Sequence, residues 1–187
     1  MTVARISRRQ WLMLPPLGAS WAAVLAAQQH AHQVMQGAPA TLTFFSREEA
    51  FEISAIASQI IPSDGSPGAR EAGVVYFIDR ALSTFDAAKR GPYSQGLRET
   101  QQRRAAMFPG SKSIAELKAE QQIQLLRAIE NTDFFEQVRT HSIVGFFGNP
   151  SYGGNRNQAG WKLIGFEDKF QFEPPFGYYD GPGEEKE

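Results

Sequence analysis

The chain has 187 residues, of which 19 are Lys or Arg, 20 are Asp or Glu and none is Cys. This charge balance excludes the basic footprint of a nucleic-acid-binding protein. The lack of cysteine excludes disulfides, cysteine-ligated iron–sulfur clusters and c-type haem attachment within this chain.

The N-terminal segment has an adjacent arginine pair followed by apolar residues, which is typical of a twin-arginine export signal. The residues of this signature are Ser7, Arg8, Arg9, Trp11 and Leu12. A membrane anchor is the alternative interpretation. However, the apolar stretch at 14–27 is shorter than the roughly 20 residues that span a bilayer, and Pro15-Pro16 interrupts it. We therefore expect residues 1–27 to be a signal peptide that directs the protein through the twin-arginine translocase to the periplasm.

A polar, Ala-rich stretch at 28–43 follows and is interpreted as a linker. It contains His30 and His32, a spacing that can bind a metal ion. Two ligands in a linker would make a weak site, so we interpret this stretch as a solvated spacer and predict no metal site there.

The next two segments have the apolar spacing of helices. Ser46 and Glu49 form a capping box, and the helix that it starts should end before Pro62. A turn-rich loop at 63–68 leads to a second predicted helix at 69–88, ended by Gly91-Pro92. Its expected buried face comprises Val74, Val75, Ile78, Leu82 and Phe85.

Further helices are predicted along the chain. A polar helix is expected at 93–107, and Ser113 and Glu116 form a second capping box before one or two helices that reach Glu130. Thr132 or Asp133 caps another, which ends at 147–150. The expected apolar residues are Ile114, Leu117, Ile123, Leu126 and Ile129, and then Phe134, Phe135, Val138 and Phe146.

No alternating strand pattern of useful length is present, so the predicted fold class is all-α. We expect a small irregular helical domain with an aromatic, Gly/Pro-rich C-terminal extension. The expected boundaries are a helical domain at 44–173 and a tail at 174–187.

The sequence contains no recognisable catalytic, cofactor-binding or metal-binding motif. The glycines at 65–68 and 152–155 lack the spacing of a nucleotide-binding turn. His141 is the one histidine of the expected folded region. Beside Glu136 or Asp133 it could act as a general base, but no nucleophile accompanies it. We therefore predict no catalytic, cofactor-binding or metal-binding residue.

Several short motifs, in order, resemble one known family. They are the export signal at Ser7-Arg8-Arg9, then Ile60–Pro62 with Asp64, Pro67–Ala69, Glu71–Val74, Phe77–Asp79, Phe134-Phe135, Gly145–Phe147, Pro150, Tyr152–Asn155 and Gly160–Gly165. The chain resembles the small (gamma) subunit, subunit 3, of the membrane-bound gluconate 2-dehydrogenases and related flavin-dependent sugar and sugar-acid dehydrogenases. The resemblance covers about residues 44–166, is least clear at 93–112 and does not extend into the tail.

This resemblance implies a non-catalytic subunit and chaperone of an oxidoreductase complex. A large subunit of the glucose–methanol–choline (GMC) type would bind FAD, and a multihaem cytochrome c subunit, if present, would carry haem c. The small subunit would assist folding, assembly and twin-arginine export of the flavoprotein, and the periplasmic complex would be held at the inner membrane through partner subunits. The substrate would be set by the large subunit.

We expect a partner-facing loop formed by Tyr152, Gly153, Gly154, Asn155 and Trp161. The alternative is that these residues close the helical domain, and one turn can do both. Two alternatives for the whole chain also remain open at this point. One is a free-standing periplasmic helical binding protein, and the other is an enzyme that uses His141 and nearby acids.

Overall fold

The computed structural model describes residues 41–169 and 171, and within them the fold is all-α, as predicted. The α-helices are α3 (Arg47–Ile60), α4 (Val74–Ser83), α5 (Arg90–Met107), α6 (Ala119–Ile129), α7 (Asp133–Phe147) and α8 (Ala159–Leu163). Short 3-10 helices, η1 (Ala87–Lys89), η2 (Pro150–Tyr152) and η3 (Arg156–Gln158), lie in the connections. The predicted signal peptide with its Ser7-Arg8-Arg9 motif, the linker up to residue 40 and the 174–187 tail lie outside the described residues.

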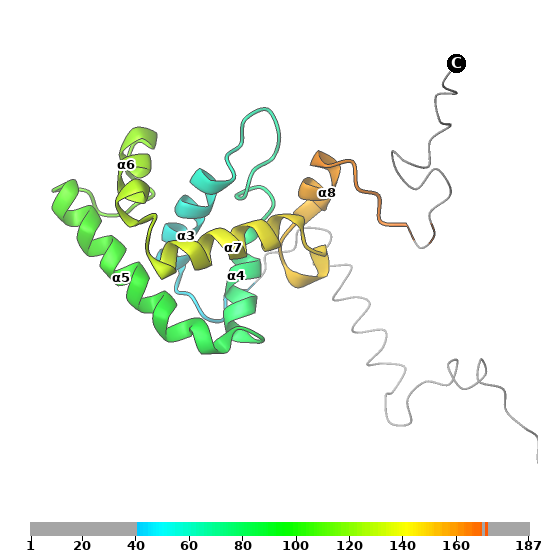
Figure 1. Cartoon of the computed structure of the whole chain (residues 1–187), viewed down its shortest axis with the longest axis horizontal. Coiled ribbons are helices and arrows are strands. Elements are labelled where there is room, and N and C mark those ends of the chain that lie inside the picture. Colours follow the sequence, from blue (N-terminus) through cyan, green and yellow to red (C-terminus); the bar gives the residue numbers. More distant parts are fainter. Residues whose placement is uncertain (1–40, 170, 172–187) are drawn as a thin grey trace, which may run out of the picture.

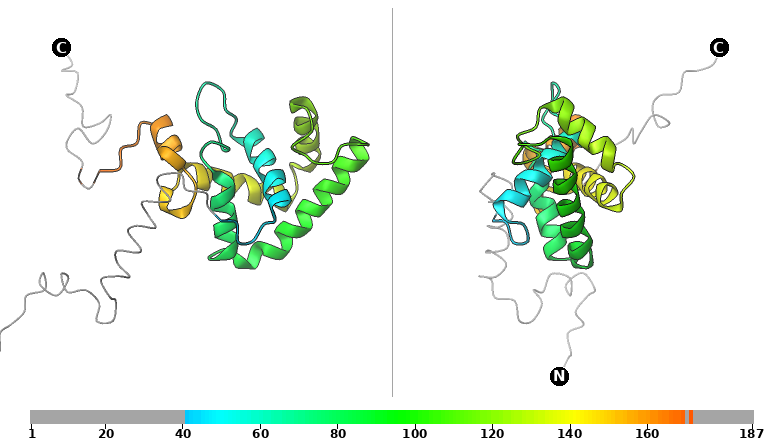
Figure 2. Two further views of the ribbon diagram at one scale, coloured as in Figure 1. Left: turned by 180° about the vertical axis from the view of Figure 1, so that it is seen from behind. Right: turned by 90° about the vertical axis from the view of Figure 1, so that its left-hand side faces the viewer.

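Helix α7 is the centre of the domain, because α3, α4, α5 and α8 all pack against it. Figure 1 shows α5 and α6 at one end of α7 and α8 at the other, and Figure 2 shows the same order from behind. The inner face of α7 carries Phe134, Val138 and Phe146, all buried as predicted. Among the described residues, no helix is both long and apolar enough to span a membrane.

The capping predictions for α3 and α7 are confirmed. Ser46 Oγ accepts the Glu49 N–H at 3.1 Å, and the Glu49 carboxylate accepts the Ser46 N–H at 2.9 Å. Thr132 Oγ1 accepts the Phe135 N–H at 3.2 Å at the start of α7. Each cap supplies an acceptor for an amide that has no partner within its helix.

The predicted helix at 69–88 is wrong at both ends. Gly73, at φ 67°, sets the start of α4, and the helix ends before Thr84, at φ −127° and ψ −99°. Phe85, predicted to be buried, is 64% exposed because the chain has left the helix before it. Gly91-Pro92, predicted as a break, lies in the first turn of α5, where proline removes no helical hydrogen bond.

The second predicted capping box forms a turn instead of a helix start. Ser113 Oγ accepts the Glu116 N–H, but the Glu116 carboxylate accepts from Lys112 N–H, at 3.2 Å each. Helix α6 begins at Ala119, and Ile123 lies on its exposed side. A hydrogen bond fixes this turn to α3, since the buried Glu52 carboxylate accepts the Ile114 N–H at 2.7 Å.

A buried carboxylate on α4 holds residues 43–45, just before α3, against the domain. Asp79, 3% exposed, accepts three successive backbone N–H groups, from Thr43, Phe44 and Phe45, at 2.8, 2.9 and 2.8 Å. Hydrogen bonds to a carboxylate are among the stronger ones in proteins. The segment that precedes α3 is therefore tied to α4.

Candidate functional site

Two segments far apart in the sequence, 68–80 and 145–165, meet at the α8 end of the molecule. Arg156 N–H donates to the Ala72 carbonyl oxygen at 3.0 Å, and Arg80 Nη1 donates to the Ser151 carbonyl oxygen at 2.7 Å. The Arg156 guanidinium lies 4.0 Å from the centre of the Tyr76 ring, a cation–π contact. The motifs of the family resemblance that lie within these two segments are therefore brought together here.

Glycines allow this close approach. A Cβ at Gly145 would lie 2.8 Å from Cδ1 of Phe77, and a Cβ at Gly154 would collide with the Gly145 carbonyl oxygen. A Cβ at Gly160 would collide with the Phe146 carbonyl oxygen. Backbone thus packs directly on backbone where residues 150–165, which we call the closing segment, cross the end of α7.

Asn155 and Trp161 complete the closure with their side chains. Asn155 is fully buried at φ 46°; its Nδ2 donates to the Gly148 carbonyl oxygen and its Oδ1 accepts the Gly160 N–H, both at 2.8 Å. Trp161 Nε1 donates to the Phe147 carbonyl oxygen at 2.7 Å. Both side chains therefore bridge the closing segment and the C-terminal end of α7.

The structure thus places the five residues of the predicted partner-facing loop in two groups. Gly153, Gly154, Asn155 and Trp161 are buried and contribute to closing the domain, whereas Tyr152 is half exposed. Partner binding by this loop stays a prediction, and Tyr152 is the member whose side chain is accessible.

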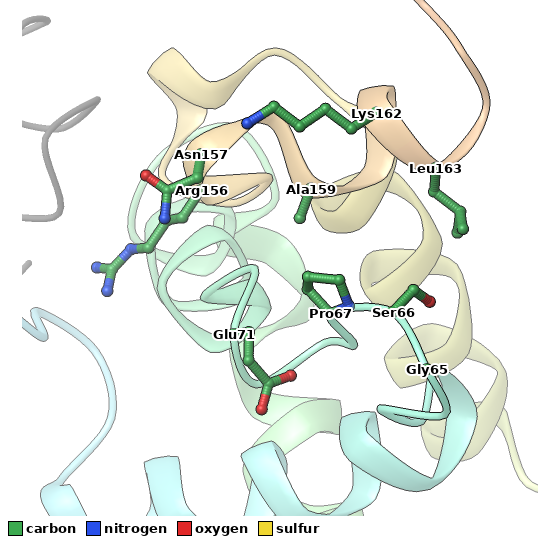
Figure 3. Close-up of a pocket in the computed structure, with 9 residues that line it drawn as sticks. All are labelled: Gly65, Ser66, Pro67, Glu71, Arg156, Asn157, Ala159, Lys162 and Leu163. Atoms are coloured by element: carbon green, nitrogen blue, oxygen red, sulfur yellow. The ribbon is translucent and has the colours of Figure 1, made fainter.

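A groove of about 450 Å³ lies beside the closing segment (Figure 3) and was not predicted from the sequence. It runs between the 65–67 loop and α8, and Glu71, Arg156 and Lys162 give it a polar lining. The Glu71 carboxylate accepts hydrogen bonds from Ser63 Oγ at 2.6 Å and from Gly68 N–H at 2.9 Å. These hydrogen bonds lower the pKa of Glu71, and the bond from Ser63 has the largest effect. The carboxylate thus stabilises the loop that forms one wall of the groove.

His141 has a different partner from those expected. Its Nε2 lies 2.8 Å from Oδ2 of Asp86, whereas Glu136 pairs with Arg139. The imidazole is buried and stacks on the Tyr93 ring, with 5.8 Å between ring centres. The hydrogen bond to His141 is the main cause of the lowered pKa of Asp86. These contacts are those of a side chain that joins α7 to the connection between α4 and α5.

In the part of the chain that the structure describes, no group of three or more His, Asp or Glu side chains is arranged to hold a metal ion. The candidate site is a packed junction with a polar groove beside it.

The sequence was compared with known families, curated proteins and solved structures. Residues 47–168 match the model of one family, described as gluconate 2-dehydrogenase subunit 3. No curated protein and no solved structure gives a significant match. The matched range begins with α3 and extends past α8, so it includes the groove and the closing segment. Because the match covers well over half of the sequence, the chain belongs to the gluconate 2-dehydrogenase subunit 3 family.

Proposed function

We propose that the chain is the non-catalytic small subunit of a periplasmic, FAD-dependent sugar or sugar-acid dehydrogenase complex. The observation that carries this proposal is the family match over 47–168, since the family is defined as one subunit of a dehydrogenase. In this proposal FAD is bound by a GMC-type large subunit, and haem c by a cytochrome subunit where one is present.

The contacts of the described residues support an accessory role. His141, the side chain best suited to acid–base chemistry, is buried against Tyr93 and bonded to Asp86. The buried carboxylates of Asp79 and Glu52 accept backbone N–H groups from neighbouring segments. Each of these groups is engaged in holding the domain together.

The sequence before the domain supports a role in export. The Ser7-Arg8-Arg9 motif precedes a domain whose first described segment is anchored by Asp79. The twin-arginine route carries folded proteins, so a leader attached to a folded small subunit can carry a bound flavoprotein with it. We propose that this chain assists folding, assembly and twin-arginine export of the large subunit.

Co-expression with the cognate flavoprotein tests the proposal. FAD content and dehydrogenase activity are measured in periplasm and cytoplasm for the native chain and for Arg8→Lys/Arg9→Lys. We expect periplasmic activity to require the arginine pair, while Arg5→Lys, a matched change outside the pair, leaves export intact. If the flavoprotein reaches the periplasm in active form without this chain, the escort function is wrong.

A further inference from the structure

The exposed apolar side chains are concentrated at the α8 end of the molecule. Of the ten large hydrophobic side chains that are exposed in the described residues, five lie on the last turns of α7 and on α8 and the turn after it. We call these five the end surface: Ile143, Val144, Leu163, Ile164 and Phe166. The two elements are in contact, since α8 packs on α7, and Figure 1 shows α8 and the C-terminal end of α7 at the end opposite α6. Exposed apolar residues concentrated on adjacent elements indicate a binding surface more than scattered ones do.

The part of the end surface on α7, Ile143 and Val144, is poor in charge. No Asp, Glu, Lys or Arg occurs between Arg139 and Arg156, the longest such interval in the described chain. On the other part, the exposed Lys162 precedes Leu163 and the exposed Glu167 follows Phe166. Charged residues border the end surface: Arg139 pairs with Glu136, and Lys169 pairs with Glu167. An apolar centre with few charges inside a polar rim is the usual composition of a protein–protein interface.

Three polar atoms of the closing segment, beneath the end surface, already have partners. Trp161 Nε1, Asn155 Nδ2 and Asn155 Oδ1 all bond to backbone groups of the same domain. Burying a polar group that lacks a hydrogen bond is costly. A partner that covers this end therefore displaces water from apolar side chains without leaving these groups unpaired.

The backbone that carries the end surface is fixed before any partner binds. Gly154 and Gly160 hold the closing segment against α7, and Phe166 is placed by its N–H bond to the Trp161 carbonyl oxygen at 2.8 Å and by its contact with the Trp161 ring. A surface that is already ordered loses little conformational entropy on binding. The end surface is thus organised in advance for docking.

We propose that the end surface binds the flavin-binding large subunit, through an apolar face of that subunit with few charges. This inference rests on the proposed function, because membership in a subunit family supplies the partner. It differs from the loop expectation in placing the contact on α7 and α8 instead of the buried glycines and Asn155. A second copy of this chain and its own residues 172–187 are the competing occupants, and the experiment separates them.

The experiment compares full-length variants co-expressed with the cognate flavoprotein. Leu163→Glu/Ile164→Glu places charge in the end surface, and Leu163→Ala/Ile164→Ala removes apolar area while it keeps helix propensity. Phe51→Glu/Phe85→Glu is the matched control, since Phe51 and Phe85 are 69% and 64% exposed on other elements. The amount of FAD, read by absorbance, that copurifies with the tagged chain reports binding, and circular dichroism reports folding.

We expect the Glu pair to lower copurified flavoprotein roughly tenfold or more and the Ala pair to lower it measurably. The matched control should bind as the native chain does. Equal binding by the native chain and a folded end-surface variant overturns the inference, as does an equal loss in the control. If the native chain itself copurifies no flavoprotein, the proposed function is wrong as well. If the native chain and a folded end-surface variant bind equally, only the inference about the end surface is wrong.

Two further measurements on the chain alone complete the test. Light scattering should show a monomer; a dimer that the Glu pair dissociates would assign the end surface to self-association and overturn the inference. Hydrogen exchange of the α8 amides should be the same with and without residues 172–187. Loss of protection on truncation would show that the chain's own tail occupies the surface, which also overturns it.

Discussion

Asn155 shows how a single residue can hold the closing segment. Its side-chain amide makes two hydrogen bonds: Nδ2 donates to the Gly148 carbonyl oxygen, and Oδ1 accepts the Gly160 N–H. Its backbone has φ 46°, a left-handed conformation that Asn adopts more readily than most residues. Conformation and hydrogen bonding therefore favour the same residue at this position.

Replacing this side chain should destabilise the domain strongly. We predict that Asn155→Ala lowers the free energy of unfolding by about 2–4 kcal/mol, because the buried Gly160 N–H and the partly buried Gly148 carbonyl oxygen lose their partner and Ala is strained at this φ. Urea denaturation of the purified chain measures the change. Asn157→Ala is the matched control, since Asn157 has φ 55° but is exposed. A loss of the same size in both variants would attribute the effect to backbone strain and contradict the hydrogen-bond argument.

The sequence identified the residues of this segment but did not decide their role. Glycines and asparagine at 153–155 indicate a turn, and the two interpretations, partner contact and closure, use the same residue types. The packing of Gly154 on Gly145 shows that these residues help to close the helical domain. That contact depends on tertiary structure, so the sequence alone does not reveal it. The groove beside it was not predictable for the same reason, because its walls at 65–67 and 159–163 are separated by most of the domain.

At the scale of the helices, the sequence predicts a helix start correctly where a side chain caps its own helix. Ser46 and Thr132 mark the starts of α3 and α7 correctly. The end of α4 was missed because apolar spacing continues to Phe85, although that side chain lies in solvent. The Asp86 N–H returns to the Ala81 carbonyl oxygen at 2.8 Å in a turn that brings Asp86 to His141. The helix therefore ends where Asp86 contacts His141, 55 residues away in the sequence. The spacing of nearby apolar residues does not reveal such a contact.

This contact should make stability depend on pH in the acid range. The hydrogen bond from His141, with Lys89 nearby, holds the pKa of Asp86 below its ordinary value of 3.8. Because the folded pKa is the lower one, the pair stabilises the fold above the unfolded pKa and this stabilisation is lost as the pH falls through the folded pKa. We predict that Asp86→Asn lowers Tm by about 3–6 °C near pH 6, and that the difference from the native chain shrinks toward pH 3.

Thermal melts of both proteins between pH 3 and pH 7 measure this effect. Asp64→Asn, a change of the same kind in the exposed 63–68 loop, serves as the control and should follow the native chain at every pH. A Tm difference for Asp86→Asn that is constant over the whole range would assign the loss to packing instead of ionisation.

At the scale of the whole molecule, an arginine-rich helix contrasts with the apolar end surface. Helix α5 carries Arg90, Arg98, Arg103 and Arg104 against a single acidic residue, Glu99, while the end surface lies on α7 and α8 (Figure 1). The exposed arginines of α5 and the end surface would bind partners by different forces. Apolar burial responds little to salt, whereas attraction between exposed charges is screened within about 10 Å at 0.1 M ionic strength.

This asymmetry predicts the thermodynamics of the complex. If the flavoprotein docks on the end surface, its affinity should change less than about threefold between 50 and 500 mM NaCl, and the heat capacity of binding should be negative. Isothermal titration calorimetry at three temperatures and two salt concentrations measures both quantities. Arg98→Glu, an exposed change on α5, should leave the affinity unaltered. An affinity that falls more than about tenfold with salt, and that Arg98→Glu also reduces, would place the contact on α5, because only a charge-driven interface responds to both changes.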